Sequence, residues 1–144
     1  GRERLFLRFQ QCRYIGVVSV EQQADLAARL DDIILNINLD AAGCVGQRTA
    51  VSLYGCPAPM EAATKASVDA RDGFILGEPW FSSDHSIFVQ KGRPAMAITS
   101  ENFAWLCEEI THTTADSVDM ADAGTMVEVA GFLREMIDAI AAVE

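Results

Sequence analysis

The chain has 144 residues, with 11 basic and 21 acidic side chains and a formal net charge of −10. This charge disfavours nucleic acid as a partner, because affinity for nucleic acid depends on neutralising phosphates with Lys and Arg, and it disfavours an anionic membrane surface. The length predicts a single domain over residues 1–144, and no apolar run reaches the roughly 18 residues that a membrane-spanning helix needs.

The first predicted elements alternate between strands and helices. The apolar patterns predict, in chain order, a strand over 5–9, an amphipathic helix over 20–33, a strongly apolar strand over 33–39, a strand over 49–54, and a helix from about 58 to 69 with Pro59 in its first turn. A strand as apolar as the one over 33–39 is typical of a buried position in a parallel sheet.

The second half of the chain continues the alternation. It is predicted to contain, in chain order, an irregular stretch over 73–83, a short helix over 84–90, a strand over 95–99, a helical turn or insertion over 102–109, and a long helix over 122–143. In the long helix, the residues expected near one apolar face are Val127, Phe132, Met136 and Ile140, with Ile137 widening it. The pattern predicts an α/β fold, a three-layer sandwich with a mostly parallel central sheet.

Cysteine usage bears on the compartment. The four cysteines stand at positions 12, 44, 56 and 107, and no pair has the C-x-x-C spacing of zinc-finger and redox motifs. Scattered reduced thiols are typical of a cytoplasmic protein, so a cytoplasmic location is predicted, while one or two disulfides remain compatible with the sequence. The basic and apolar N-terminal segment is short and broken by Arg8, so it does not predict a signal peptide.

A carboxylate follows the most apolar predicted strand. Asp40 comes directly after this strand, and a turn of small residues with Gly43 comes next. Sites in open α/β sheets gather outside the carboxyl ends of the strands, so Asp40 is a candidate metal ligand, with capping of the following turn as the alternative. Asn36 and Asn38 alternate along the same strand and need hydrogen-bond partners in a buried sheet.

One histidine is of the kind that binds metals. The ring of His112 is a candidate ligand, and its second nitrogen needs an acceptor, which Asp116 can provide. The alternative is that Asp116, together with Ser117, caps the final helical region.

The other histidine lies beside an aromatic pair. Asp84 and His85 follow Trp80 and Phe81, and the four are candidates for a substrate pocket with a polar lip and an aromatic wall. The alternative is an ordinary helix start, in which Ser83 or Asp84 satisfies the free backbone amides.

Four stretches together resemble the C-terminal half of the co-catalytic zinc exopeptidase family, which includes bacterial leucyl aminopeptidase, aminopeptidase Y and glutaminyl cyclase-like proteins. They are Asn38-Leu39-Asp40-Ala41-Ala42-Gly43, Ser83-Asp84-His85-Ser86-Ile87-Phe88, Gly92-Arg93-Pro94-Ala95 and His112-Thr113-Thr114-Ala115-Asp116. The likeness extends over about residues 5–143. It implies the zinc-exopeptidase α/β fold, truncated at its N-terminal side.

The resemblance also implies roles for single residues. Asp40 is then a ligand of one zinc ion and His112 a ligand of the other, while Asp116 orients His112. Asp84 and His85 line or support the substrate pocket. In the family a bridged zinc pair activates water for attack on a peptide carbonyl next to a free amino terminus, so the implied ligand is a peptide or an amino-acid-like molecule.

The sequence departs from the family pattern after the first predicted strand, where the family carries an acidic pair. Gln10 and Gln11 stand at that place, and no Asp or Glu occurs between Arg4 and Val20. Glutamine neither takes up a proton at neutral pH nor binds zinc as an anion, and catalytic zinc normally has three protein ligands. We therefore expect the isolated chain to hold zinc weakly and not to cleave peptides.

Three hypotheses about function remain open at this point. The chain is the C-terminal portion of a zinc aminopeptidase-like protein and inactive alone. Alternatively, it is a non-catalytic binding or dimerisation module that uses the loop with Trp80 and Phe81 and pairs an exposed sheet edge with a second copy. As a third option, a partner carrying the missing ligands completes the enzyme in trans.

Overall fold

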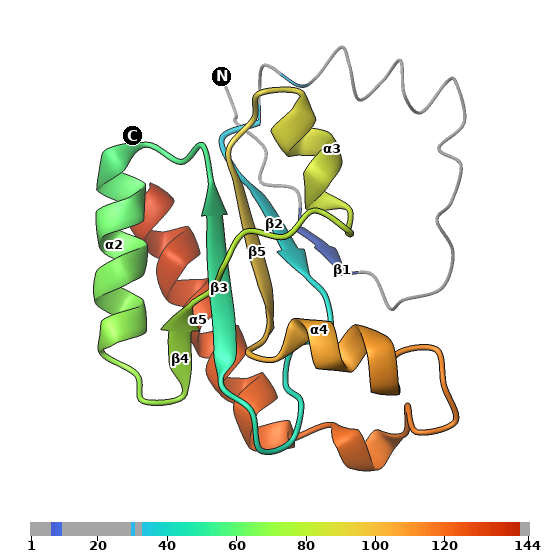
Figure 1. Ribbon diagram of the computed structural model, residues 1–144. Coiled ribbons are helices and arrows are strands. Elements are labelled where there is room, and N and C mark those ends of the chain that lie inside the picture. Colours follow the sequence, from blue (N-terminus) through green and yellow to red (C-terminus); the bar gives the residue numbers. More distant parts are fainter. Residues whose placement is uncertain (1–6, 10–29, 31–32, 142–144) are drawn as a thin grey trace.

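A computed structural model describes residues 7–9, 30 and 33–141 of the chain. Within these residues, five strands form one sheet in the order β1-β2-β5-β3-β4 (Figure 1). Their bounds are β1 (Leu7–Phe9), β2 (Asn36–Leu39), β3 (Thr49–Tyr54), β4 (Phe74–Leu76) and β5 (Ala95–Ser100).

The sheet is mostly parallel, which confirms the prediction. The pairs β1–β2, β2–β5 and β3–β4 are parallel, whereas β3 and β5 run antiparallel. Strand β2 therefore has a parallel neighbour on both sides, with Asn38 in register with Arg8 and Ala97. This is the buried parallel position that its apolar sequence predicted.

Helices cover both faces of the sheet, so the three-layer architecture is also confirmed. The helical elements are α2 (Ala58–Asp69), α3 (His85–Gln90), α4 (Phe103–Trp105), a π-helical turn (Leu106–Ile110), a 3-10 turn (Val118–Met120) and α5 (Ala123–Ala141). Helices α2 and α5 lie side by side on one face, and α3 lies on the other (Figure 1). No helix among the described residues has the length and apolar character to cross a bilayer.

The two faces of β5 show how the layers are built. Met96 and Ile98 point into the main hydrophobic core under α2 and α5, while Ala95 and Ala97 alternate with them and face the α3 side. The small alanine side chains leave room for Trp80 to pack directly on the sheet. The strand is fully buried along its length, as expected for the middle of a sheet.

Most of the elements that the sequence predicts are present, with one addition and one gap. The addition is strand β4, which lies inside the stretch predicted to be irregular. It has only three residues, and Phe74 is the only one of the three that is buried. So short an element leaves no detectable alternation. The helix predicted over 20–33 lies mainly outside the described residues.

The predicted apolar face of α5 needs one correction. Phe132 and Met136 are buried as expected, but 72% of the Val127 surface is exposed. Phe132 follows Val127 by five positions, which places Val127 about 140° around the helix from it. Val129 and Leu133 fall on the core-facing side instead and are buried.

The start of α5 is held by a side-chain cap. The carboxylate of Asp122 accepts a hydrogen bond from the backbone N–H of Thr125 at 2.6 Å, and this bond lowers the pKa of Asp122. We expect Asp122→Ala to lower the thermal unfolding midpoint by a few degrees. Asp119→Ala, in the exposed 3-10 turn just upstream, is the control and should leave the midpoint unchanged. Equal midpoints for the two variants would contradict a capping role.

Candidate functional site

The turn after β2 is held by the last residue of β5. The N–H of Asp40 donates to the carbonyl of Ile98 at 3.0 Å, which extends the sheet by one residue. The buried hydroxyl of Ser100 donates to the carbonyl of Ala41 at 2.7 Å and accepts from the N–H of Cys44 at 3.0 Å. These bonds fix the chain on both sides of the turn, so the backbone at Asp40 has a defined position at the carboxyl edge of the sheet.

The same turn requires glycine at position 43. Gly43 has a φ of +82°, a conformation that other residues adopt only with strain. A Cβ atom added there would also lie 2.9 Å from the Cγ of Met126 on α5. The turn therefore approaches α5 more closely than any larger residue would allow.

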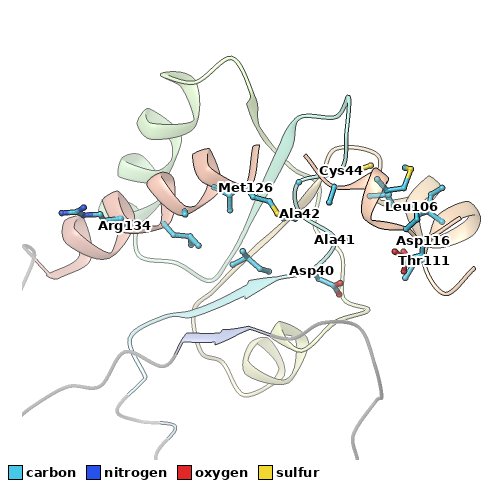
Figure 2. Close-up of a pocket in the computed structure, with 18 of the residues that line it drawn as sticks. Asp40, Ala41, Ala42, Cys44, Leu106, Thr111, Asp116, Met126 and Arg134 are labelled. Atoms are coloured by element: carbon cyan, nitrogen blue, oxygen red, sulfur yellow. The ribbon is translucent and has the colours of Figure 1, made fainter. Parts of the chain in front are cut away.

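A groove opens beside this turn. It has a volume of about 1220 Å³ and lies between the turn after β2, the segment from the π-helical turn to the 3-10 turn, and α5 (Figure 2). Its walls are mainly apolar and include Leu39, Ala42, Leu106, Ile110, Met120, Met126, Val129, Leu133 and Ile137. Polar groups are few, as is usual in ligand-binding clefts.

Two of the predicted site residues line the groove together. Asp40 lies on the groove wall that the sheet provides. Asp116 lies beside Thr111 on the opposite wall (Figure 2). His112 is not among the lining residues. It is exposed, has a φ of +65°, and sits in the turn between Thr111 and Asp116.

The His112 turn is organised by a threonine rather than by Asp116. The hydroxyl of Thr113 donates to the carbonyl of Ile110 at 2.8 Å and accepts from the N–H of Ala115 at 3.1 Å. In the described part of the chain no hydrogen bond joins Asp116 to His112. The orienting role of Asp116 therefore remains a prediction.

His85 lies on the other side of the sheet and is completely buried. Its Nε2 is 2.7 Å from the carbonyl of Trp80, and its Nδ1 is 3.3 Å from the amide nitrogen of Asn38. Because a carbonyl only accepts and an amide nitrogen only donates, the geometry fits the neutral tautomer with the proton on Nε2. Burial is the main cause that lowers the pKa of His85, while the hydrogen bond to the Trp80 carbonyl and, less strongly, the nearby Asp40 and Asp84 act in the opposite direction.

The aromatic residues near His85 pack with one another. The Trp80 ring lies 4.6 Å from that of His85 and 4.2 Å from that of Phe103, measured between centroids. The Tyr54 hydroxyl donates to the carbonyl of Trp80 at 2.7 Å and accepts from its N–H at 2.8 Å. The aromatic loop is thus tied to β3 through the backbone of Trp80.

The four residues predicted to form a substrate pocket belong to this packed region. Phe81 stays 59% exposed next to Tyr54, and Asp84 immediately precedes α3 without making a side-chain cap. None of Trp80, Phe81, Asp84 and His85 lines the groove beside Asp40. Their part in binding substrate remains a prediction.

The arrangement of the metal-binding side chains decides whether a zinc ion fits here. Within the residues that the structure describes, no three His, Cys, Asp or Glu side chains gather at one point that could hold a metal. Asp40 faces the groove, whereas His112 lies on a neighbouring turn. A catalytic zinc takes three protein ligands, so these residues do not fit a closed zinc site.

The sequence did not point to Ser100 or to the apolar walls of the groove. Ser100 directly follows the strand predicted over 95–99, and its residue type alone gives no sign of the two hydrogen bonds that its hydroxyl makes. Leu106 and Ile110 are spaced as i and i+4, which was the only available signal that one face of that segment is apolar. Their position opposite α5 depends on tertiary contacts, among them the bridge between Cys44 and Ala121.

Comparison with known proteins gives one match. The family model described as Peptidase family M28 matches residues 18–137, which is most of the chain. No curated protein and no solved structure matches the chain.

Proposed function

The chain belongs to peptidase family M28, and from this membership we propose that it is a peptidase-like domain that binds peptides at the groove beside Asp40 without hydrolysing them unaided. The single observation that carries the proposal is the position of Asp40. Asp40 follows strand β2, which has parallel neighbours on both sides, and it lines the groove. This is where α/β sheets place their ligand sites.

The chemistry of the groove suits one end of a peptide. Asp40 and Asp116 face a space whose walls are otherwise mostly apolar. A carboxylate attracts the protonated amino terminus of a peptide, while Ile110 and Met120, which line the groove and are partly exposed, offer contacts to an apolar side chain. The preferred ligand is therefore a short peptide with a free amino terminus and an apolar first residue.

We do not expect the chain alone to hydrolyse peptides. Zinc is the metal expected from the resemblance, but the described residues do not close a site for it. Gln10 and Gln11 stand where the resemblance expects an acidic pair, so the sequence supplies neither a proton acceptor nor an anionic ligand there.

The alternative is a non-catalytic module that uses the aromatic loop as its contact surface. Phe81 would carry that contact, because it is the exposed member of the aromatic pair, while Trp80 packs against His85 and Phe103. Replacing Phe81 with Ser would then lower affinity for a partner without affecting peptide binding at Asp40.

The proposal predicts that Asp40→Asn weakens binding of a short leucine-rich peptide with a free amino terminus. We expect a loss of about three- to tenfold in affinity, since one partly exposed charge pair is removed. Isothermal titration calorimetry with this peptide and its N-acetylated twin measures the effect. The acetylated peptide should bind wild type and variant equally.

The control variant is Asp72→Asn, which removes an exposed carboxylate from the turn between α2 and β4. It changes the net charge by the same amount and should leave the affinity unchanged. If Asp72→Asn weakened binding as much as Asp40→Asn, the effect would come from overall charge, and Asp40 would not be the binding group.

A further inference from the structure

The groove extends along α5 well beyond Asp40. Met126, Ala130, Leu133 and Ile137 line it at positions i, i+4, i+7 and i+11, which form one stripe along the helix. The stripe is about 16 Å long, or three helical turns. Met126 at its start is 47% exposed. Figure 2 shows Met126 and Arg134 well separated along α5. A short peptide that binds only through its amino terminus at Asp40 would leave most of the α5 stripe uncovered.

The walls facing α5 are apolar as well. Leu106 and Ile110 lie one helical turn apart on the opposite wall, and Leu39 and Ala42 come from the turn after β2. An apolar channel with a helical stripe as one wall is the type of surface that receives an amphipathic helix. Such a helix places anchors at i, i+3 or i+4, and i+7, and one further anchor at i+11 extends this pattern along the three turns of the α5 stripe.

The charge around the groove selects among possible occupants. Among the described residues, Asp40, Asp116 and Asp138 line the groove, against one basic residue, Arg134. The Nε of Arg134 lies 4.0 Å from the Oδ2 of Asp138, and both side chains are largely exposed, so this ion pair is weak. The groove is therefore negative overall and favours an occupant with Lys or Arg on its polar face.

Two occupants from this protein itself have the wrong charge. A second copy carries a net charge of −10. The amphipathic sequence over residues 20–33 contains Glu21, Asp25, Asp31 and Asp32 against Arg29 alone. Either would bring further carboxylates to an acidic groove, which costs free energy.

We propose that the α5 groove docks a basic amphipathic helix supplied by another protein. The proposal extends the proposed function, since both use the groove, but it depends on the stripe along α5 and not on binding of an amino terminus at Asp40. The occupant is defined by its chemistry: about three turns of helix, an apolar stripe on one side, and lysine or arginine on the other.

The probe is a fluorescently labelled 15-residue peptide with leucine at i, i+4, i+7 and i+11 and lysine at the polar positions. Its N-terminus is acetylated, so that it cannot act as a ligand with a free amino terminus. Fluorescence anisotropy should show binding that weakens as the NaCl concentration rises. A twin with glutamate for lysine, a scrambled peptide of equal composition and a peptide of residues 20–33 should each bind at least tenfold more weakly.

A matched pair of variants on α5 tests the location. Met126→Lys puts a positive charge on the groove wall and should lower the affinity for the basic peptide roughly tenfold or more. Val127→Lys adds the same charge one residue further along, at an exposed position that does not line the groove, and should leave affinity unchanged. Ala130→Lys, on the exposed side of the stripe, serves as a second groove variant if Met126→Lys alters thermal unfolding.

The outcomes separate this proposal from the proposed function. If the basic helix binds and responds to Met126→Lys while the short peptide does not respond to Asp40→Asn, docking stands and the amino-terminus site fails. The docking proposal is overturned if the basic peptide does not bind at about 100 µM. It is equally overturned if the acidic twin binds as tightly, or if Val127→Lys and Met126→Lys have the same effect.

Discussion

Phe132→Ala is expected to lower the free energy of unfolding by about 3–5 kcal/mol. The Phe132 side chain is fully buried between α5 and the sheet, and its ring lies 5.1 Å from that of Phe74, measured between centroids. The guanidinium of Arg71 lies 5.7 Å from the Phe132 ring and adds a cation–π contact. Alanine would remove both contacts and leave a cavity where α5 meets β4.

Urea unfolding followed by circular dichroism measures this loss. Val127→Ala is the control, since Val127 lies on the same helix but faces away from the core. Its effect should stay within about 0.5 kcal/mol. A loss below about 1 kcal/mol for Phe132→Ala would mean that α5 is not anchored to the sheet through this ring.

His85→Gln is expected to lower stability by about 2–4 kcal/mol at pH 7.5, because it disturbs a buried group with both ring nitrogens in hydrogen bonds. It should also remove a pH dependence. Burial lowers the pKa of His85 below its usual 6.5, so below pH 6.5 the unfolded chain binds a proton that the folded chain does not. The contribution of His85 to the free energy of unfolding is then fully present above pH 6.5, and it decreases as the pH drops towards the folded-state pKa.

Urea unfolding at pH 7.5 and pH 5.5 tests both effects. Wild type should lose stability between the two values, whereas His85→Gln should lose clearly less. The chain has only one other histidine, His112, which is exposed. His112→Gln should therefore keep the wild-type pH dependence. If His112→Gln flattened the dependence and His85→Gln did not, the buried histidine would not be the group that titrates.

The main elements of the fold could be predicted because their patterns are local. Strands β3 and β5 are mostly apolar runs, and Pro57 just before α2 together with Pro59 in its first turn marks where that helix begins. Strand β4 could not be predicted because three residues are too few for alternation to appear. The antiparallel pairing of β3 with β5 also left no local signal, since a central strand is buried on both faces in either direction.

Only one part of the candidate site could be predicted from the sequence, namely the residue that directly follows a strand. Asp40 lies at the edge of the sheet because it follows β2 directly. The surroundings of His85 depend on Asn38 from β2 and Trp80 from a distant loop, and no spacing in the sequence brings these together. The groove likewise needs α5 and the π-helical turn to lie opposite each other, which follows from tertiary packing alone.

The most direct measurement for the central claim is mass spectrometry of a leucine-rich peptide with a free amino terminus, incubated with the chain and zinc. We predict that the peptide stays intact, because the chain offers the groove beside Asp40 but no three ligands for zinc within its described residues. Zinc-dependent release of the first amino acid, abolished by Asp40→Asn, would contradict the account, since a complete hydrolytic centre would then exist within this chain.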